Sequence, residues 1–72
     1  MITNYSFTAT DNILYKTIKN RIYIDDFNIE YRVTGLTKIN SVTHIILEEL
    51  LKPGKFHIIG SHELSRLKYT IK

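Results

Sequence analysis

Apolar and polar residues alternate most regularly between residues 27 and 34. Phe27, Ile29, Tyr31 and Val33 fall on one parity of this segment and polar residues on the other, which is the period-2 pattern of a half-buried strand. Shorter or less regular β-prone runs occupy 5–9, 13–18 and 21–24. The Asp-Asp pair at 25–26 favours a turn, so we predict a β-hairpin over 21–34.

The segment 42–51 fits a helix better than a strand. As a strand it would carry polar residues on both faces. At about 100° per residue, a helix gathers three polar side chains on one stripe: His44, Glu48 and Lys52. Asn40 or Ser41 could supply the N-cap oxygen, and Pro53 disfavours helical geometry in the residue before it. We therefore predict a helix over about 41–52.

The remaining segments complete an α+β prediction. Gly54 can adopt the positive φ of a type II turn after Pro53, 55–60 is a strand, 61–64 a turn or short helical bend, and 66–72 a last strand. Its core-facing residues are predicted to be Leu67, Tyr69 and Ile71. The predicted fold over 1–72 is a single globular domain with an antiparallel sheet of four to five strands packed on one helix. The alternative is an all-β small barrel, in which 42–51 is a strand paired with 55–59.

Composition indicates a folded protein without covalent cross-links. Hydrophobic residues make up 43% and charged residues 24% of the chain, which are ordinary globular values. Cysteine is absent, which excludes disulfides and thiolate zinc sites. A membrane-spanning helix needs about 20 apolar residues. No apolar run of this sequence approaches that length, so we expect no membrane partner. The first residues lack the pattern of a secretory signal, so we expect a cytoplasmic protein.

Residue usage adds a hypothesis about the source. Ile is the commonest residue, Ala9 is the only alanine and Trp is absent, as an AT-rich coding sequence would produce. Bacteriophages and mobile elements have this bias, and such a protein would work in the cytoplasm of its host.

The predicted helix has more apolar surface than one sheet can cover. Its apolar arc extends over about 240°, against the ≳100° that a surface helix usually buries. A partner protein or a second copy of the chain could cover the excess, since exposed apolar patches mark interaction sites. The predicted interface residues are Leu47, Glu49 and Leu51. A terminal strand of the same chain could also cover this side.

Basic residues beside tyrosines support a second hypothesis. The net charge is +3 and the pI about 9.3, and single-stranded nucleic acids bind where aromatic rings lie beside basic side chains. The candidates are Tyr15, Lys16, Lys19, Arg21 and Tyr23, with Arg66, Lys68 and Lys72 as contacts to phosphates or to an acidic protein. Lysines also protect edge strands from aggregation, which is an alternative reason for the last three.

No pattern predicts catalysis or metal binding. The spacing of His44, His57 and His62 defines no ligand set, and the neighbours Ser61, His62 and Glu63 cannot point at one another as a catalytic triad requires. We predict no enzyme, metal, cofactor or small-molecule substrate. The sequence favours a non-catalytic protein-binding module that acts stoichiometrically, such as a phage inhibitor or regulator of a host protein. The alternative is a small nucleic-acid-binding protein.

Overall fold

A computed structural model describes residues 7–71 as one antiparallel sheet with two helices. The elements in chain order are α1 (Ala9–Ile18), β1 (Arg21–Ile24), β2 (Glu30–Ile39), β3 (Val42–Glu49), β4 (Phe56–Gly60), α2 (Ser61–Leu64) and β5 (Lys68–Ile71). The strand order is β4-β3-β2-β1-β5. The predicted α+β class is confirmed, and the sheet stays open between β4 and β5 instead of closing into the alternative barrel.

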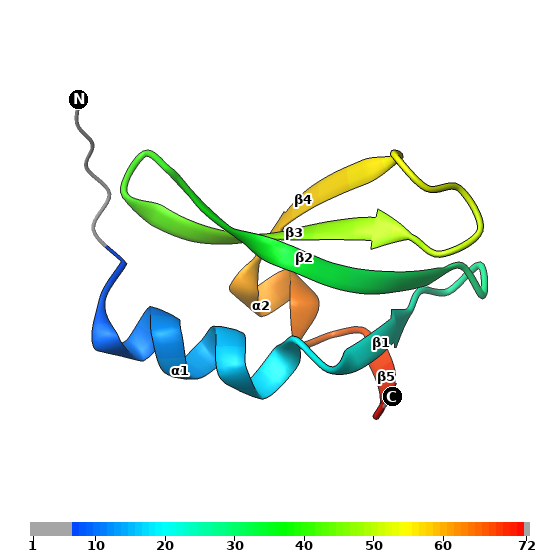
Figure 1. Ribbon diagram of the computed structural model, residues 1–72, viewed down its shortest axis with the longest axis horizontal. Helices are drawn as coiled ribbons and strands as arrows, with labels where there is room; N and C mark the ends of the chain where they lie inside the picture. Colours follow the sequence, from blue (N-terminus) through cyan, green and yellow to red (C-terminus); the bar gives the residue numbers. More distant parts are fainter. Residues whose placement is uncertain (1–6, 72) are drawn as a thin grey trace.

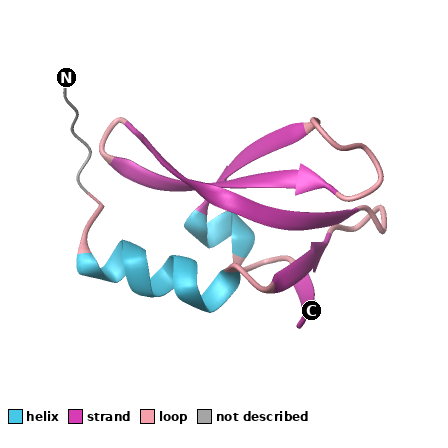
Figure 2. Ribbon diagram, in the orientation of Figure 1, coloured by secondary structure: helices cyan, strands magenta, loops and turns pink. Residues whose placement is uncertain are grey.

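Both helices lie on the same side of the β2–β3–β4 sheet, as Figures 1 and 2 show. We call this side the inner face and the opposite side the outer face. The inner face carries the core, which buries side chains from both helices and from the three central strands: Ile18, Tyr23, Tyr31, Val33, Ile45, Leu47 and Leu64. Burial of this apolar surface is the main stabilising contribution in a domain of this size.

The helix predicted over 41–52 is wrong, because residues 42–49 form strand β3, which lies inside the sheet between β2 and β4. Asn40 and Ser41 have φ values of 50° and 65°, and Ile39 pairs directly with Val42. Positive φ at both central residues is the signature of a two-residue type I′ hairpin turn. The two polar residues that resemble an N-cap therefore reverse the chain, and 42–49 is a strand, as the all-β alternative predicted.

The long helix lies near the start of the chain, where the sequence predicted strands over 5–9 and 13–18. Thr8 and Asp11 form a capping box: the Thr8 hydroxyl accepts from the Asp11 N–H at 3.2 Å, and the Asp11 carboxylate accepts from the Thr8 N–H at 2.9 Å. The capping box satisfies two of the free N–H groups at the start of α1. Leu14 and Ile18, one turn apart, then pack against the core. Tyr5 lies outside the described residues.

The predicted hairpin over 21–34 is confirmed in its pairing but not in its first two apolar residues, since Phe27 and Ile29 both precede β2 and are exposed. β1 and β2 pair antiparallel, and Tyr31 and Val33 are buried. Phe27, however, is 84% exposed. The Asp25 carboxylate accepts hydrogen bonds from the Phe27 N–H at 2.8 Å and the Ile29 N–H at 3.0 Å, so Phe27 lies in the turn and outside the strand.

The last strand is confirmed, but two of its three predicted core residues are exposed. Leu67 packs against the core, whereas Tyr69 and Ile71 are exposed. The physical reason is the position of β5 at the edge of the sheet, beyond the part that the helices cover.

The Pro53-Gly54 turn provides a test of backbone strain. Lys55 donates to the Lys52 carbonyl at 3.0 Å and Gly54 has a φ of 91°, which matches the predicted type II turn. We expect Gly54→Ala to lower the free energy of unfolding by about 1–3 kcal/mol, because a side chain disfavours this conformation. Gly35→Ala is the control, since its added Cβ meets no atom within 4 Å and its φ is not positive. Equal urea midpoints for the two variants would contradict the prediction.

Candidate protein-binding surface

The outer face of the sheet carries a group of apolar side chains that no part of the described chain covers. Ile39 pairs with Val42 and Ile46 with Ile58, and directly opposite residues of an antiparallel pair share a face. Phe56, two residues from Ile58, is on that face too. We call these five residues, Ile39, Val42, Ile46, Phe56 and Ile58, the outer apolar patch. All of them except the half-buried Ile46 are exposed, Phe56 at 55% and Ile58 at 53%.

A salt bridge between two side chains borders the outer apolar patch. Arg32 and Glu48 are cross-strand neighbours, and their side chains form a salt bridge. Glu48 also accepts the Gly54 N–H at 2.7 Å. This hydrogen bond and the Arg32 guanidinium hold the pKa of the Glu48 carboxyl below its ordinary value. The Glu48 carboxylate beside the patch is therefore fixed and paired. This pairing lowers the desolvation cost of the carboxylate when a partner covers the surface.

The predicted interface residues Leu47, Glu49 and Leu51 do not share an exposed face. Leu47 is 2% exposed in the core, because the odd-numbered residues of β3 point to the inner face. Glu49 is buried, and its carboxylate contacts the His57 imidazole at 2.7 Å and the Lys55 ammonium at 3.4 Å. Leu51 is 91% exposed in the turn after β3. The helical surface that grouped the three residues is wrong, and a role for Leu51 in partner binding stays a prediction.

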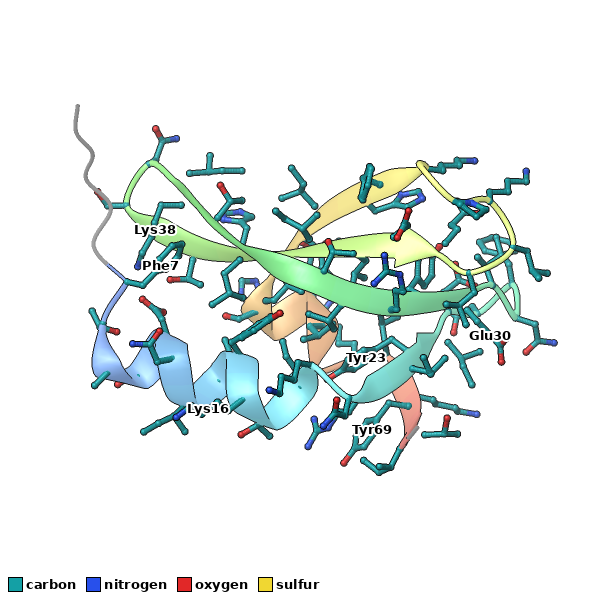
Figure 3. All side chains as sticks on the ribbon, in the orientation of Figure 1. Phe7, Lys16, Tyr23, Glu30, Lys38 and Tyr69 are labelled. Atoms are coloured by element: carbon teal, nitrogen blue, oxygen red, sulfur yellow. The ribbon has the colours of Figure 1, made fainter. Side chains whose placement is uncertain are left out.

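The two tyrosines predicted to stack on nucleic-acid bases do not form an exposed pair of rings. Tyr23 of β1 is fully buried in the core, and Tyr15 is half-buried against it. Arg21 is held between aromatic groups: its guanidinium lies 3.9 Å from the centre of the Tyr69 ring and donates to the Tyr23 hydroxyl at 3.2 Å. Figure 3 shows Tyr23 inside the fold and Tyr69 at its edge. The tyrosine exposed beside this cation is thus Tyr69, which the sequence assigned to the core.

The candidate basic residues do not gather on one face. Lys16 projects from α1, on the inner side of the sheet (Figure 3). Lys68 pairs with Ile24, so it lies on the opposite face from Tyr23 and Tyr69. Lys19 follows α1 and Arg66 precedes β5, while Lys72 lies outside the described residues. A row of Arg66, Lys68 and Lys72 tracking one backbone stays a prediction.

The inner face has a pocket of about 310 Å³ beside α2. Its lining includes Asp25, Tyr31, His57, Glu63 and Arg66 over an apolar floor. The Tyr31 hydroxyl donates to Asp25 at 2.8 Å, and the Tyr31 ring meets the His57 ring edge to face at 5.3 Å. These contacts hold the polar groups of the pocket in place.

The titration properties of these groups indicate structural hydrogen bonds. Burial, together with the Asp25 carboxylate, raises the pKa of Tyr31 to about 12, so its hydroxyl stays protonated and donates. Burial alone would raise the pKa of Asp25, but the Ile29 N–H, the Tyr31 hydroxyl and the Phe27 N–H lower it below its ordinary value. Both groups are locked in their ordinary protonation states at neutral pH. They lack the intermediate pKa that suits a general acid or base.

The sequence prediction missed the outer apolar patch although a signal was present. In 56–60, Phe56 and Ile58 fall on one parity and Ile59 on the other. A strand with one solvated face normally alternates apolar and polar residues. Apolar residues on both parities of a strand therefore indicate that both of its faces are covered, or that one of them is a binding surface.

Two specific features are absent from the described part of the chain. Within residues 7–71, no group of three or more His, Asp or Glu side chains could hold a metal ion. Neither helix of this part of the chain has the length and apolar character of a membrane span. Compared with protein-family models, curated proteins and solved structures, the chain matches none of them.

Proposed function

We propose that the protein is a non-catalytic protein-binding module that acts stoichiometrically through the outer apolar patch. The observation that carries this proposal is the register of the sheet, which brings Ile39, Val42, Phe56 and Ile58 to one face while both helices cover the other. Clustered exposed apolar residues on a small domain mark interaction sites. The Ile-rich, Ala-poor composition, which an AT-rich coding sequence would produce, extends the proposal to a phage or mobile-element inhibitor or regulator of a host protein.

The charge of the chain defines the kind of partner. A net charge of +3 attracts acidic surfaces and accelerates association with them. The patch itself holds apolar side chains, and its neighbouring carboxylate is paired with Arg32. We therefore propose a partner with an apolar contact surface and a net negative charge. Added salt should slow the association of the protein with this partner more than it weakens the final complex. The reason is that salt screens charges but not the burial of apolar surface.

A substitution in the patch tests the proposal. We expect Val42→Asp to abolish stoichiometric capture of a protein from extracts of the cells in which the gene is expressed, because it places an unpaired charge within the apolar surface that the partner buries. The matched control is Ile13→Asp, which adds the same charge at a more exposed site on α1, on the other side of the sheet, and should leave capture intact. Binding is then measured with the captured protein after purification. Capture that survives Val42→Asp, or is lost equally in both variants, would contradict the proposal.

Nucleic-acid binding is the competing function, and the same variants separate it. Binding to a short single-stranded oligonucleotide should weaken steeply with salt if several phosphates are neutralised. It should be insensitive to Val42→Asp and reduced by Lys16→Ala combined with Lys19→Ala. Salt-dependent oligonucleotide binding of this kind, with no protein captured through the patch, would replace the proposed function by the alternative.

A further inference from the structure

The strand β4 lies at the edge of the sheet with unused backbone groups. Glu49 donates its N–H to the Lys55 carbonyl at 3.1 Å, and hydrogen-bonded pairs recur at every second residue of an antiparallel ladder. The bonded pairs with β3 are therefore Leu47 with His57 and Ile45 with Ile59. It follows that the backbone N–H and C=O groups of residues 56, 58 and 60 point away from the sheet.

Two residues of this edge remain open to a partner strand. The Gly60 N–H donates to the Glu63 carboxylate at 3.1 Å, so the end of β4 is occupied. Within residues 7–71, no such hydrogen bond is formed by the outward groups of Phe56 and Ile58. These residues also carry exposed side chains of the outer apolar patch. The same two residues thus offer hydrogen-bonding groups at the edge and apolar surface beside it.

The edge lacks the features that normally prevent strand addition. Natural edge strands carry proline, outward-pointing lysine or a bulge. β4 contains none of these: its residues are Phe56, His57, Ile58, Ile59 and Gly60, and its pairing with β3 is regular. Its one titratable side chain, His57, is turned to the inner face and bonded to Glu49.

We infer that β4 pairs antiparallel with β4 of a second copy across a two-fold axis, so that two open sheets join into one. This inference rests on the proposed function, because it makes the two outer apolar patches a single surface for the partner. A two-fold contact is isologous and closes at two copies. In an antiparallel pair, opposite residues share a face, so the outer face of one copy continues into the outer face of the other.

The free backbone groups select one register. Pairing Phe56 with Ile58 of the second copy, and Ile58 with Phe56, uses all four open groups of each edge and forms four hydrogen bonds. A register centred on Ile58 would require the Gly60 N–H, which Glu63 already occupies. In the favoured register, His57 faces His57 of the second copy in a non-hydrogen-bonded pair, whose Cα atoms are about 4.5 Å apart.

The other edge of the sheet is a poorer partner for β4. The Asp25 N–H donates to the Ile29 carbonyl at 3.1 Å, and the same alternation makes Tyr69 and Ile71 the outward residues of β5. Their side chains lie on the inner face, with Tyr23. Pairing β4 with β5 would join the outer face of one copy to the inner face of the next. Such a head-to-tail contact does not end at two copies unless it forms a ring.

The first experiment measures the solution mass of variants at the edge. Light scattering over a concentration range should give two copies for the wild-type protein and for Ile58→Val, which keeps the N–H and the apolar side chain. Ile58→Pro should be a folded monomer at the same concentrations, because proline removes an outward donor that the β3 ladder does not use. A monomeric wild-type protein, a mass above two copies, or a folded Ile58→Pro variant that remains dimeric would overturn the inference.

A cysteine cross-link tests the register even if Ile58→Pro does not fold. The chain has no cysteine, so each single-cysteine variant can form a disulfide only between copies. Because the Cα separation across the axis is compatible with a disulfide, His57→Cys should give covalent dimers rapidly under mild oxidation, whereas the exposed Leu51→Cys should not. Equal rates for the two variants would overturn the inference. The proposed function is tested separately: loss of partner capture in Val42→Asp can occur whether or not β4 pairs.

Discussion

Ile45→Ala is expected to lower the free energy of unfolding by about 2–5 kcal/mol, the range measured for removing a large aliphatic side chain from a packed core. Ile45 is fully buried at the centre of β3. It lies directly between Leu36 of β2 and Ile59 of β4, and both of these neighbours pack against the core. The substitution leaves a cavity that three hydrogen-bonded strands cannot close without breaking their pairing.

The small size of the chain makes this loss serious. A domain of about 60 residues buries only about 60% of the surface that its unfolded chain exposes, so the total free energy of unfolding is near the low end of the usual 5–15 kcal/mol. Ile39→Ala is the control: it removes the same atoms from an exposed position on the outer face and should change stability by about 0.5 kcal/mol or less. Urea unfolding followed by circular dichroism measures both, and similar losses would refute the core described above.

The same strand shows how far the sequence predicts the fold. Alternation and turn residues are local properties of a sequence. Local patterns therefore predict the hairpin of β1 and β2, the turn at Pro53-Gly54, β4, the bend at 61–64 and the last strand. The wrong helix prediction at 42–51 arose because the two sides of β3 have different surroundings. Its odd residues Ile45 and Leu47 enter the core, whereas Val42 and Ile46 belong to an apolar outer face.

An interior strand with two apolar faces loses the alternation that identifies a strand. Glu48 and Glu49 do not restore the alternation of apolar and polar residues, because both are buried beside cationic groups. Glu48 pairs with Arg32, and Glu49 pairs with Lys55 and His57. These cations come from β2 and from the segment 55–57, so their pairing depends on tertiary structure. The same cause hid the candidate site: the outer apolar patch combines residues from three strands, and only the register brings them together.

The helix α1 was missed for a different reason. The sequence Thr8-Ala9-Thr10-Asp11 has the spacing of a capping box, a local signal that marks a helix start. The sequence prediction followed the β-prone residues Ile13, Tyr15 and Ile18 instead and did not use this signal. What decides between the two structures is tertiary: the Asp11 carboxylate that caps α1 also accepts from the Thr43 hydroxyl at 2.7 Å and from the Lys38 ammonium at 3.0 Å. The helix is thereby anchored to the β2–β3 hairpin.

Asp11→Asn is expected to destabilise the protein at neutral pH and to reduce its sensitivity to acid. The Thr8 N–H, the Thr43 hydroxyl and the Lys38 ammonium hold the pKa of the Asp11 carboxyl far below its ordinary value of 3.8. Above that ordinary value the group is ionised in both folded and unfolded chains, and its stabilising contribution is complete. As the pH falls below it, the unfolded chain takes up a proton before the folded chain does, so stability is lost progressively.

The lowered pKa values of Asp25, Glu48 and Glu49 act in the same direction, so the wild-type protein should lose stability steadily below about pH 5. Asp11→Asn removes one of these four contributions, and its urea midpoint should fall less between pH 7 and pH 3 than that of the wild-type protein. Asp26→Asn removes the same charge from an exposed position in the β1–β2 turn and should retain the wild-type slope. Identical slopes for all three proteins would show that the Asp11 contacts are not maintained in solution.

A substitution of Lys38 shows how much of the stability lost in Asp11→Asn comes from the Asp11–Lys38 ion pair itself. Its ammonium is mostly buried, with contacts to Asp11 at 3.0 Å and to the Thr43 hydroxyl at 2.7 Å, and Figure 3 shows Lys38 close to Phe7. Removing only the carboxylate leaves this buried charge without its counter-ion, which is the costly way to break a buried pair. Lys38→Met combined with Asp11→Asn should therefore be less destabilised than the sum of the two single variants, since coupled neighbours are not additive. A strictly additive double variant would mean that the Asp11–Lys38 ion pair contributes nothing to stability, and that Asp11 stabilises the protein through the cap of α1 and the Thr43 hydrogen bond.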